Sequence, residues 1–244
     1  MDRGNKTETL FVALALTAGL WGAVATHAAV ITWNAPVQIT SESDVITDGV
    51  LFQASNFGNS SVTNQTINGV TFEAAIRTGT TTETWGNVTL SPTVAASANF
   101  LGSATTGSAA YNAMLAQTLW NVGQPSVFTI NGLTDGQNYM LQYWVNDSRS
   151  IGSLGSRSVT FQDDSGGMTS DAVLEHVGPT GNLGQYIVGT FTADGTSQVV
   201  NLVQSGSTEG VLNAFQIRNI PEPASLGLLA IGGLLVGSRR RRDL

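Results

Sequence analysis

Short stretches in which apolar and polar side chains alternate fill most of the chain between residues 29 and 219. The clearest is the run from residue 139 to residue 146, where successive side chains would point to opposite faces of a strand. Similar runs follow at intervals of about 8 to 12 residues, with turn dipeptides between them. This pattern predicts an all-β fold, and we expect an antiparallel, jelly-roll-like β-sandwich.

Asn-Gly and Asp-Gly dipeptides separate these runs and favour the backbone conformations of tight hairpin turns. Asn68-Gly69 lies between apolar positions and predicts one hairpin. Asp194-Gly195 predicts a second hairpin, formed by residues 185–193 and 197–204. Residues 211–218 are the last predicted strand, which leads directly into the C-terminal segment.

One segment between residues 29 and 219 has helical rather than strand spacing. Between residues 108 and 120, apolar side chains recur three and four positions apart, and Ser108 can cap the first turn. We therefore expect one short helix, packed over a sheet or closing one end of the sandwich. Trp120 would end this helix and lie in the core.

The N-terminus has the three parts of a secretory signal peptide. Arg3 and Lys6 precede an apolar run over residues 10–24, and small residues follow. We expect a signal helix within residues 1–28 and cleavage between Ala28 and Ala29, with a cut after Ala25 as the alternative. The chain is therefore expected to be exported.

The C-terminus also has three parts: the tripeptide Pro221, Glu222 and Pro223, an uncharged run over residues 224–238, and a basic cluster. The two prolines predict a stiff, extended joint. The run of roughly 15 residues is shorter than the usual ~20 of a transmembrane helix, but flanking arginines can snorkel and extend it. We expect a transmembrane helix whose basic end stays cytoplasmic, the alternatives being a simple tail anchor or a packed C-terminal helix. The cluster comprises Arg239, Arg240, Arg241 and Arg242.

This order of parts resembles the PEP-CTERM sorting signal of exported bacterial proteins. The resemblance implies that a membrane-embedded exosortase recognises Pro221, Glu222 and Pro223 and cuts near them, with residues 226–236 in the membrane. Ile220 stands where valine is common in the family. The resemblance also implies a location in the cell envelope or extracellular matrix, membrane anchoring before processing, and association with exopolysaccharide.

Three segments follow from these signals: a signal peptide at 1–28, a sandwich ectodomain at 29–219, and a sorting segment at 220–244. The ectodomain is acidic and contains no lysine, its only basic residues being Arg77, Arg149, Arg157 and Arg218. Such a surface repels nucleic-acid backbones, so we expect no nucleic-acid partner. The chain has no cysteine, which excludes disulfides and thiolate metal sites.

Catalytic signatures are weak, and we expect no enzyme activity. His176 is the only histidine outside the signal peptide, and although Asp163, Asp164 and Ser165 are near it, no Gly-x-Ser-x-Gly elbow occurs. Acidic residues are too numerous for any pair to indicate a glycosidase. Asp147, Asp163 and Asp164 follow predicted strands, and their carboxylates are candidate calcium ligands.

Trp85 and Trp144 are candidates for stacking on sugar rings, although a core position is the favoured alternative for Trp144. The second half, from Phe128 through residues 139–146 to residues 212–217, is similar in its strand pattern to galactose-binding-like and malectin-like jelly rolls. That similarity implies carbohydrate binding through loops or a concave face, with a structural calcium. We therefore expect a structural or adhesive envelope protein, with a carbohydrate-binding module as the alternative and a secreted glycan hydrolase as the least favoured.

Overall fold

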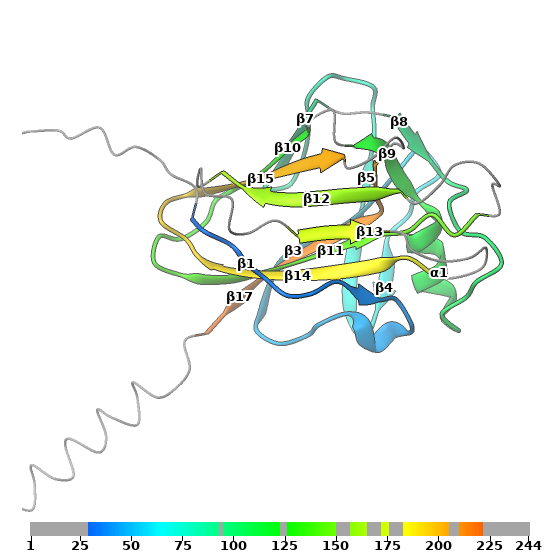
Figure 1. The fold of residues 1–244 in the computed structure, drawn as a ribbon, viewed down its shortest axis with the longest axis horizontal. Helices are drawn as coiled ribbons and strands as arrows, with labels where there is room; N and C mark the ends of the chain where they lie inside the picture. The colour runs from blue at the N-terminus through cyan, green and yellow to red at the C-terminus, as the bar shows by residue number, and fades with distance from the viewer. Residues whose placement is uncertain are drawn as a thin grey trace, which may run out of the picture.

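A computed structural model describes residues 29–92, 95–122, 126–149, 157–164, 172–175, 183–204 and 210–221. These residues form two large sheets packed face to face, a third small sheet and one short α-helix (Figure 1). The all-β sandwich predicted from the sequence is therefore confirmed. The expected signal helix and transmembrane helix lie outside the described residues.

The larger sheet has eight strands. In spatial order they are β1 (Thr32–Trp33), β14 (Gln185–Thr192), β11 (Asn138–Val145), β17 (Ala214–Ile220), β3 (Val50–Gly58), β5 (Val70–Ile76) and β4 (Gln65–Ile67), and β2 (Val37–Gln38) also pairs with β14. Every described pair in it is antiparallel except β3 with β5. The last strand, β17, therefore lies between two neighbours in the middle of this sheet.

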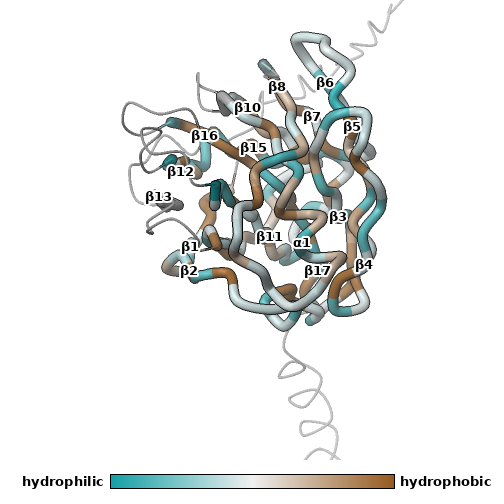
Figure 2. Tube along the Cα trace, turned by 90° about the vertical axis from the view of Figure 1, so that its right-hand side faces the viewer, coloured by the Kyte–Doolittle hydropathy of each residue, from teal (hydrophilic) through white to brown (hydrophobic). Residues whose placement is uncertain are grey.

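The second sheet has six strands: β13 (Ala172–Glu175), β12 (Ser158–Asp163), β15 (Ser197–Gln204), β10 (Ser126–Asn131), β7 (Val88–Ser91) and β6 (Glu83–Trp85). The third sheet contains β16 (Gly210–Leu212), β9 (Thr118–Val122) and β8 (Ala95–Ser97). Hydrophobic and hydrophilic positions alternate along many of these strands (Figure 2). This alternation gives each large sheet an apolar face that is buried against the other.

Aromatic rings fill the core between the two large sheets. Tyr143 from the first sheet stacks on Phe161 from the second with ring centroids 4.8 Å apart. Phe128 meets Phe215 edge to face at 5.0 Å, and all four of these side chains are fully buried. Each such ring contributes about 1.5 to 3 kcal/mol through burial, so this cluster is a main source of stability.

The helix α1 (Ala109–Ala116) covers the outer face of the larger sheet. Tyr111, Met114 and Leu115 pack there against Trp144 and Phe72. The Ser108 side chain accepts a hydrogen bond from the Tyr111 backbone N–H, as expected for an N-cap. The predicted end of the helix is wrong, because residues 118–122 form β9 between β16 and β8. Trp120 therefore lies on a strand, partly buried against the main core.

The two predicted hairpins have different outcomes. β4 and β5 pair across Asn68-Gly69, whose residues both have positive φ (47° and 76°), so this hairpin is confirmed. β14 and β15 do not pair with each other. The Asp194-Gly195 turn instead carries the chain from the larger sheet to the second sheet, because β14 pairs with β11 and β15 with β10.

The described chain enters and leaves the sandwich at the same end, on the left of Figure 1. Val30 and Thr32 line one pocket together with Ile220 and Pro221. The helix α1 lies at the opposite end of the long axis. We call these the exit end, defined by Val30 and Pro221, and the far end, defined by α1.

Candidate functional site

The C-terminal sorting segment begins inside the sheet. Asn219 pairs with Val50 of β3, and Ile220 pairs with Asn138 of β11. The Ile220 carbonyl accepts a further hydrogen bond of 3.0 Å from the Gln137 side chain. The chain is therefore fixed through Ile220, and Pro221 is the first residue beyond the ladder and is exposed.

Arg218 anchors the end of β17. Its guanidinium donates hydrogen bonds to the backbone carbonyls of Thr47, Asp48 and Gly49, at 2.7 to 2.9 Å. Burial lowers the pKa of Arg218, and the Asp48 carboxylate opposes this shift. A guanidinium remains charged at neutral pH despite such a shift. Arg218 is therefore a cation that joins β17 to the loop before β3.

Glu222, Pro223, the run at 224–238 and the four terminal arginines lie outside the described residues, as do Ala28 and His176. Ala29 is described and buried, and its carbonyl accepts a hydrogen bond from the Gln198 side chain. Among the residues that the structure describes, no helix combines the length and apolarity required to cross a bilayer.

Trp144 lies fully buried beneath α1. Its indole N–H donates a 2.7 Å hydrogen bond to the Tyr111 hydroxyl, and its ring meets Phe72 edge to face at 5.3 Å. Burial raises the pKa of Tyr111 far above its ordinary value, so the hydroxyl stays neutral. With no exposed ring face, Trp144 has the core position that the sequence left as the favoured alternative, and it offers no surface to a sugar.

Trp85 is half-buried at the end of β6. Its ring meets Phe57 edge to face at 5.1 Å, and its indole N–H donates to the Ile76 carbonyl. The Trp85 carbonyl accepts a 2.7 Å hydrogen bond from the Gln53 side chain, which also accepts from the Asn87 backbone N–H. The residues after Trp85 are thereby held against β3.

A groove of about 250 Å³ opens beside this contact, between β3, β5 and the turn that joins β6 to β7. The first half of β3, through Ala54, pairs with β17 but has no strand partner on the β5 side, because β3 and β5 pair only from Ser55 and Glu73 onward. The Glu73 carboxylate and the Asn87 amide line this groove and are exposed. Glu73 and Asn87 are not predicted as site residues from the sequence, because the divergence of two strands leaves no local sequence signal.

The three aspartates predicted as candidate calcium ligands have other partners in the structure. Among the described residues, no group of three or more His, Cys, Asp or Glu side chains is placed to hold a metal ion. Asp147 is instead paired with arginines, and Asp163 accepts a 2.9 Å hydrogen bond from the Ile31 backbone N–H. Asp164 is exposed, with the Asn201 amide 3.5 Å away.

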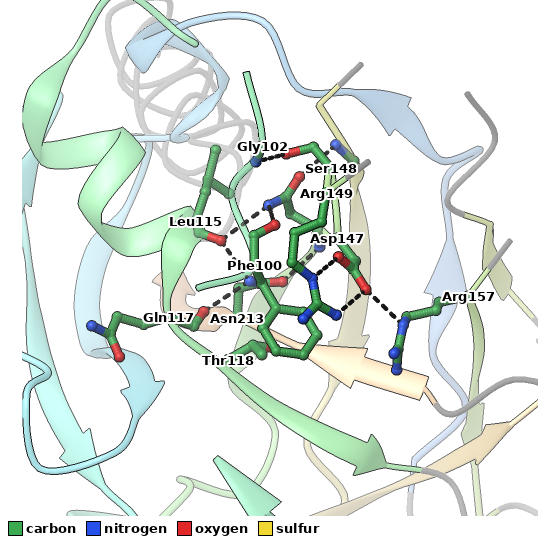
Figure 3. A network of polar contacts seen from close by, with 12 residues as sticks. Phe100, Gly102, Leu115, Gln117, Thr118, Asp147, Ser148, Arg149, Arg157 and Asn213 are labelled. Atoms are coloured by element: carbon green, nitrogen blue, oxygen red, sulfur yellow. Dashed lines mark hydrogen bonds and ion pairs between the residues drawn. The ribbon is translucent and has the colours of Figure 1, made fainter. Parts of the chain in front are cut away.

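Asp147 is the centre of a charged cluster at the far end (Figure 3). Arg149 contacts both of its carboxylate oxygens, at 2.7 and 2.8 Å, and Arg157 forms an ion pair with it at 2.7 Å. The Arg149 guanidinium also lies 3.6 Å above the centroid of the Phe100 ring. Arg149 follows Asp147 by two residues, whereas Arg157 and Phe100 are ten or more residues away in the sequence, so local spacing alone could not identify the whole cluster.

Two buried asparagines complete this network. The Asn146 side chain donates to the carbonyls of Phe100 and Leu115 and accepts from the Gly184 backbone N–H. The Asn213 side chain donates to the carbonyls of Leu115 and Gln117 and accepts from the Asn146 backbone N–H. Together they join α1, β11, the start of β14 and the link from β16 to β17, and they hold the far end as one unit.

Comparison with known families identifies a sorting motif at the C-terminal end of the described domain. Residues 219–242 match the PEP-CTERM protein-sorting motif, which includes the tripeptide at 221–223 and the basic cluster. This confirms the resemblance predicted from the sequence, and it indicates an exported protein sorted to the cell envelope. The motif implies processing by an exosortase.

The rest of the chain has more distant similarities. A search of curated proteins found no significant match. Two solved structures from Bacteroides uniformis are similar: β-glucuronidase 2 covalently bound to cyclophellitol-6-carboxylate aziridine, at TM-score 0.46, and a β-glucuronidase, at TM-score 0.42. Each is 11% identical and is matched over 69% of this chain and 18% of its own length, so this chain spans less than a fifth of either protein.

Proposed function

We propose that this protein is a non-catalytic structural or adhesive component of the cell envelope or extracellular matrix, associated with exopolysaccharide. The observation that carries the proposal is the position of the sorting motif, which begins at Asn219, within β17. Any attachment made through the motif is therefore made directly to the folded domain, with no intervening linker of its own.

The position of β17 suits a load-bearing role. Pulling on the C-terminus would act along a strand that is paired with β11 on one side and β3 on the other. Antiparallel ladder bonds lie perpendicular to the strands, so such a force loads many bonds together instead of one after another. A domain that is held to a matrix or membrane through this strand would resist extraction.

Mass spectrometry of the exported protein tests the sorting part of this proposal. We expect a mature C-terminus that lacks Arg239–Arg242, and we expect the protein in the surface or matrix fraction. Removing the exopolysaccharide should release the protein into the medium. An intact basic tail on exported protein would contradict processing, and unchanged retention without the polysaccharide would contradict the association.

The groove beside Trp85 favours a second function, carbohydrate binding. Its Glu73 carboxylate and Asn87 amide could accept and donate hydrogen bonds to sugar hydroxyls, and Phe52 contributes an apolar wall. This function would provide a direct means of attachment to exopolysaccharide. It would use the open half of β3 and not the fully buried Trp144.

Retention on immobilised polysaccharide tests this second function. Glu73→Gln and Asn87→Ala should each weaken retention. Trp85→Ala should also weaken it, because it removes the ring contact with Phe57 and the indole hydrogen bond to the Ile76 carbonyl that help to position the turn. Asp194→Asn, an exposed change at the exit end, is the matched control and should leave retention unchanged. Equal retention of all four variants and the unchanged protein would exclude this groove.

A further inference from the structure

We propose that the exit end of the sandwich is a docking surface for the membrane-embedded processing enzyme, which would read the folded domain as well as the sorting tripeptide. This inference rests on the proposed function, because it requires that the motif be processed. It concerns the surface formed by the Asp48-Gly49, Asp135-Gly136 and Asp194-Gly195 turns and the pocket beside Pro221. We call this surface the exit face.

Only a short length of chain separates the folded domain from the uncharged run of the sorting motif. Ile220 is still paired with Asn138, and the uncharged run begins at Ala224. Only Pro221, Glu222 and Pro223 lie between them, and three extended residues reach about 10 Å. An enzyme that holds the tripeptide at the membrane must therefore have the exit face close to its own surface.

In addition, β17 cannot easily release more chain. It lies between two strands, and Arg218 binds three carbonyls of the loop before β3. Freeing Asn219 and Ile220 would break backbone hydrogen bonds to the strands on both sides. It would also expose the carbonyls that Arg218 binds. The processing enzyme must therefore bind the tripeptide with the folded domain directly beside it.

The shape and charge of the exit face also favour docking. A pocket of about 390 Å³ opens there beside Pro221, and its lining residues, all of them described, are uncharged. Val30, which is 57% exposed, provides an apolar wall, and Thr32, Thr190 and Asn138 provide polar groups. The pocket is thus suited to an inserted neutral side chain from a protein partner.

Acidic turns lie beside this pocket: Asp135-Gly136 and Asp194-Gly195 are each two residues from a lining residue in the chain, and Gly49 lies against Ile220. Asp48, Asp135 and Asp194 are exposed, and backbone hydrogen bonds between Gly136 and Ala193 and between Ala193 and Gln137 hold the last two turns together. Each headgroup layer of a bilayer is only about 5 to 8 Å deep, so these carboxylates would lie near its surface. Anionic headgroups would repel them, whereas basic groups at the mouth of the enzyme would attract them.

The test compares processing rates of the full-length chain in cells that contain the processing enzyme. The exit-face variant carries Asp135→Asn and Asp194→Asn, which keep the turns as Asn-Gly. The control carries Glu42→Gln, which removes a carboxylate charge from an exposed position beside the start of α1. Pulse-chase labelling, with mass spectrometry of the C-terminus, gives the rate of conversion to mature protein.

We expect the exit-face variant to be processed about threefold to tenfold more slowly than the unchanged chain, and the control at the unchanged rate. A second variant with six Gly and Ser residues inserted between Ile220 and Pro221 moves the domain away from the enzyme by up to about 20 Å. It should also slow processing, although the tripeptide is intact.

Equal rates for all variants would overturn the docking surface, because the enzyme would then read the tail alone. Faster processing of either variant would also overturn it, because the acids or the close domain would then be obstacles at a lipid surface. Failure to process the unchanged chain would instead contradict the proposed sorting function. The two failures are therefore distinguishable.

Discussion

The exit end and the far end of the sandwich are stabilised by different kinds of hydrogen bond. At the exit end, Arg218 and Gln137 use their side chains to hold the last strand, but backbone groups close the turns, as in the bonds from Gly136 to Ala193 and from Leu133 to Thr196. At the far end, the side chains of Asn146, Asn213 and Asp147 make the connections. Backbone bonds persist after most substitutions, whereas each side-chain bond depends on one residue. The far end should therefore be much more sensitive to mutation.

The largest difference is expected at Asp147. Replacing it with alanine, Asp147→Ala, removes the carboxylate from between the guanidinium groups of Arg149 and Arg157. Loss of one member of a buried ion pair typically costs about 3 to 5 kcal/mol of unfolding free energy. Urea denaturation measures this loss. Asp135→Ala, at an exposed turn, is the control and should change stability by less than about 1 kcal/mol.

Asn213→Ala should have the next largest effect. It removes two donated hydrogen bonds and one accepted bond, and it leaves the Asn146 backbone N–H without this acceptor. We expect a loss of about 3 kcal/mol. The matched change at the exit end is Asn138→Ala. The Asn138 side chain accepts one hydrogen bond from Thr192, so this variant should lose about 0.5 kcal/mol of unfolding free energy. Similar losses for the two variants would refute the contrast between the ends.

Gly49 should be a sensitive position of the exit end, because it lies against the last strand. Its φ is +79°, and a Cβ there would lie 2.4 Å from the Asn219 backbone oxygen, so Gly49→Ala should cost about 2 to 3 kcal/mol. Gly136 has a similar φ of +76° but open space around it. Gly136→Ala should therefore cost only about 1 kcal/mol, for the backbone conformation alone. Thermal denaturation of both variants separates steric contact from backbone strain.

Smaller effects than at Asp147 or Asn213 are expected when the hydroxyl of either of two buried tyrosines is removed. The Tyr111 hydroxyl accepts a hydrogen bond from Trp144, so Tyr111→Phe should lose about 1 to 2 kcal/mol. The Tyr143 hydroxyl is buried and has no hydrogen-bond partner among the described residues. Tyr143→Phe should therefore leave stability unchanged or raise it slightly. A marked loss for Tyr143→Phe would reveal a partner for this hydroxyl.

The same tyrosines predict a dependence on pH. Burial raises the pKa of Tyr143 and of Tyr111 above the ordinary 10.0, so in the folded state both hydroxyls keep their protons where the unfolded state begins to lose them. Stability is then complete below about pH 10 and falls as pH rises above it, by about 1.4 kcal/mol per pH unit for each buried tyrosine. Tyr143→Phe should reduce this slope, as measured by urea denaturation between pH 9 and pH 11.

The fold was predictable where the structure depends on local sequence. The Asn68-Gly69 hairpin and the start of α1 at Ser108 follow from the conformations that these residues favour. The end of α1 was not predictable in this way, because β9 is paired with β8 and β16, which are distant in sequence. Asp194-Gly195 predicted a turn correctly but not that the chain changes sheets there.

The sites show the same limit. The sorting motif is contiguous and was recognised from the sequence, and the family comparison confirmed it. The alternation at 139–146 suggested that one face of the strand carrying Trp144 could be exposed, but α1 covers that face. Asp147 carries a carboxylate of the kind that binds calcium, but it is paired with Arg149, two residues along the chain, and with Arg157, which the fold brings near. Burial and long-range pairing determine such roles, and the local spacing of residues predicts neither.

The central position of β17 also constrains when the protein can fold during export. β11 and β3 have no direct pairing with each other, since β17 lies between them. The larger sheet can therefore be completed only after residue 220, the second residue of the sorting motif, has crossed the membrane. Until then, the earlier strands must pass through the translocation channel as unfolded polypeptide, with their aromatic side chains unburied. Final assembly of the domain and delivery of its tail to the sorting machinery are thus expected to occur at almost the same moment.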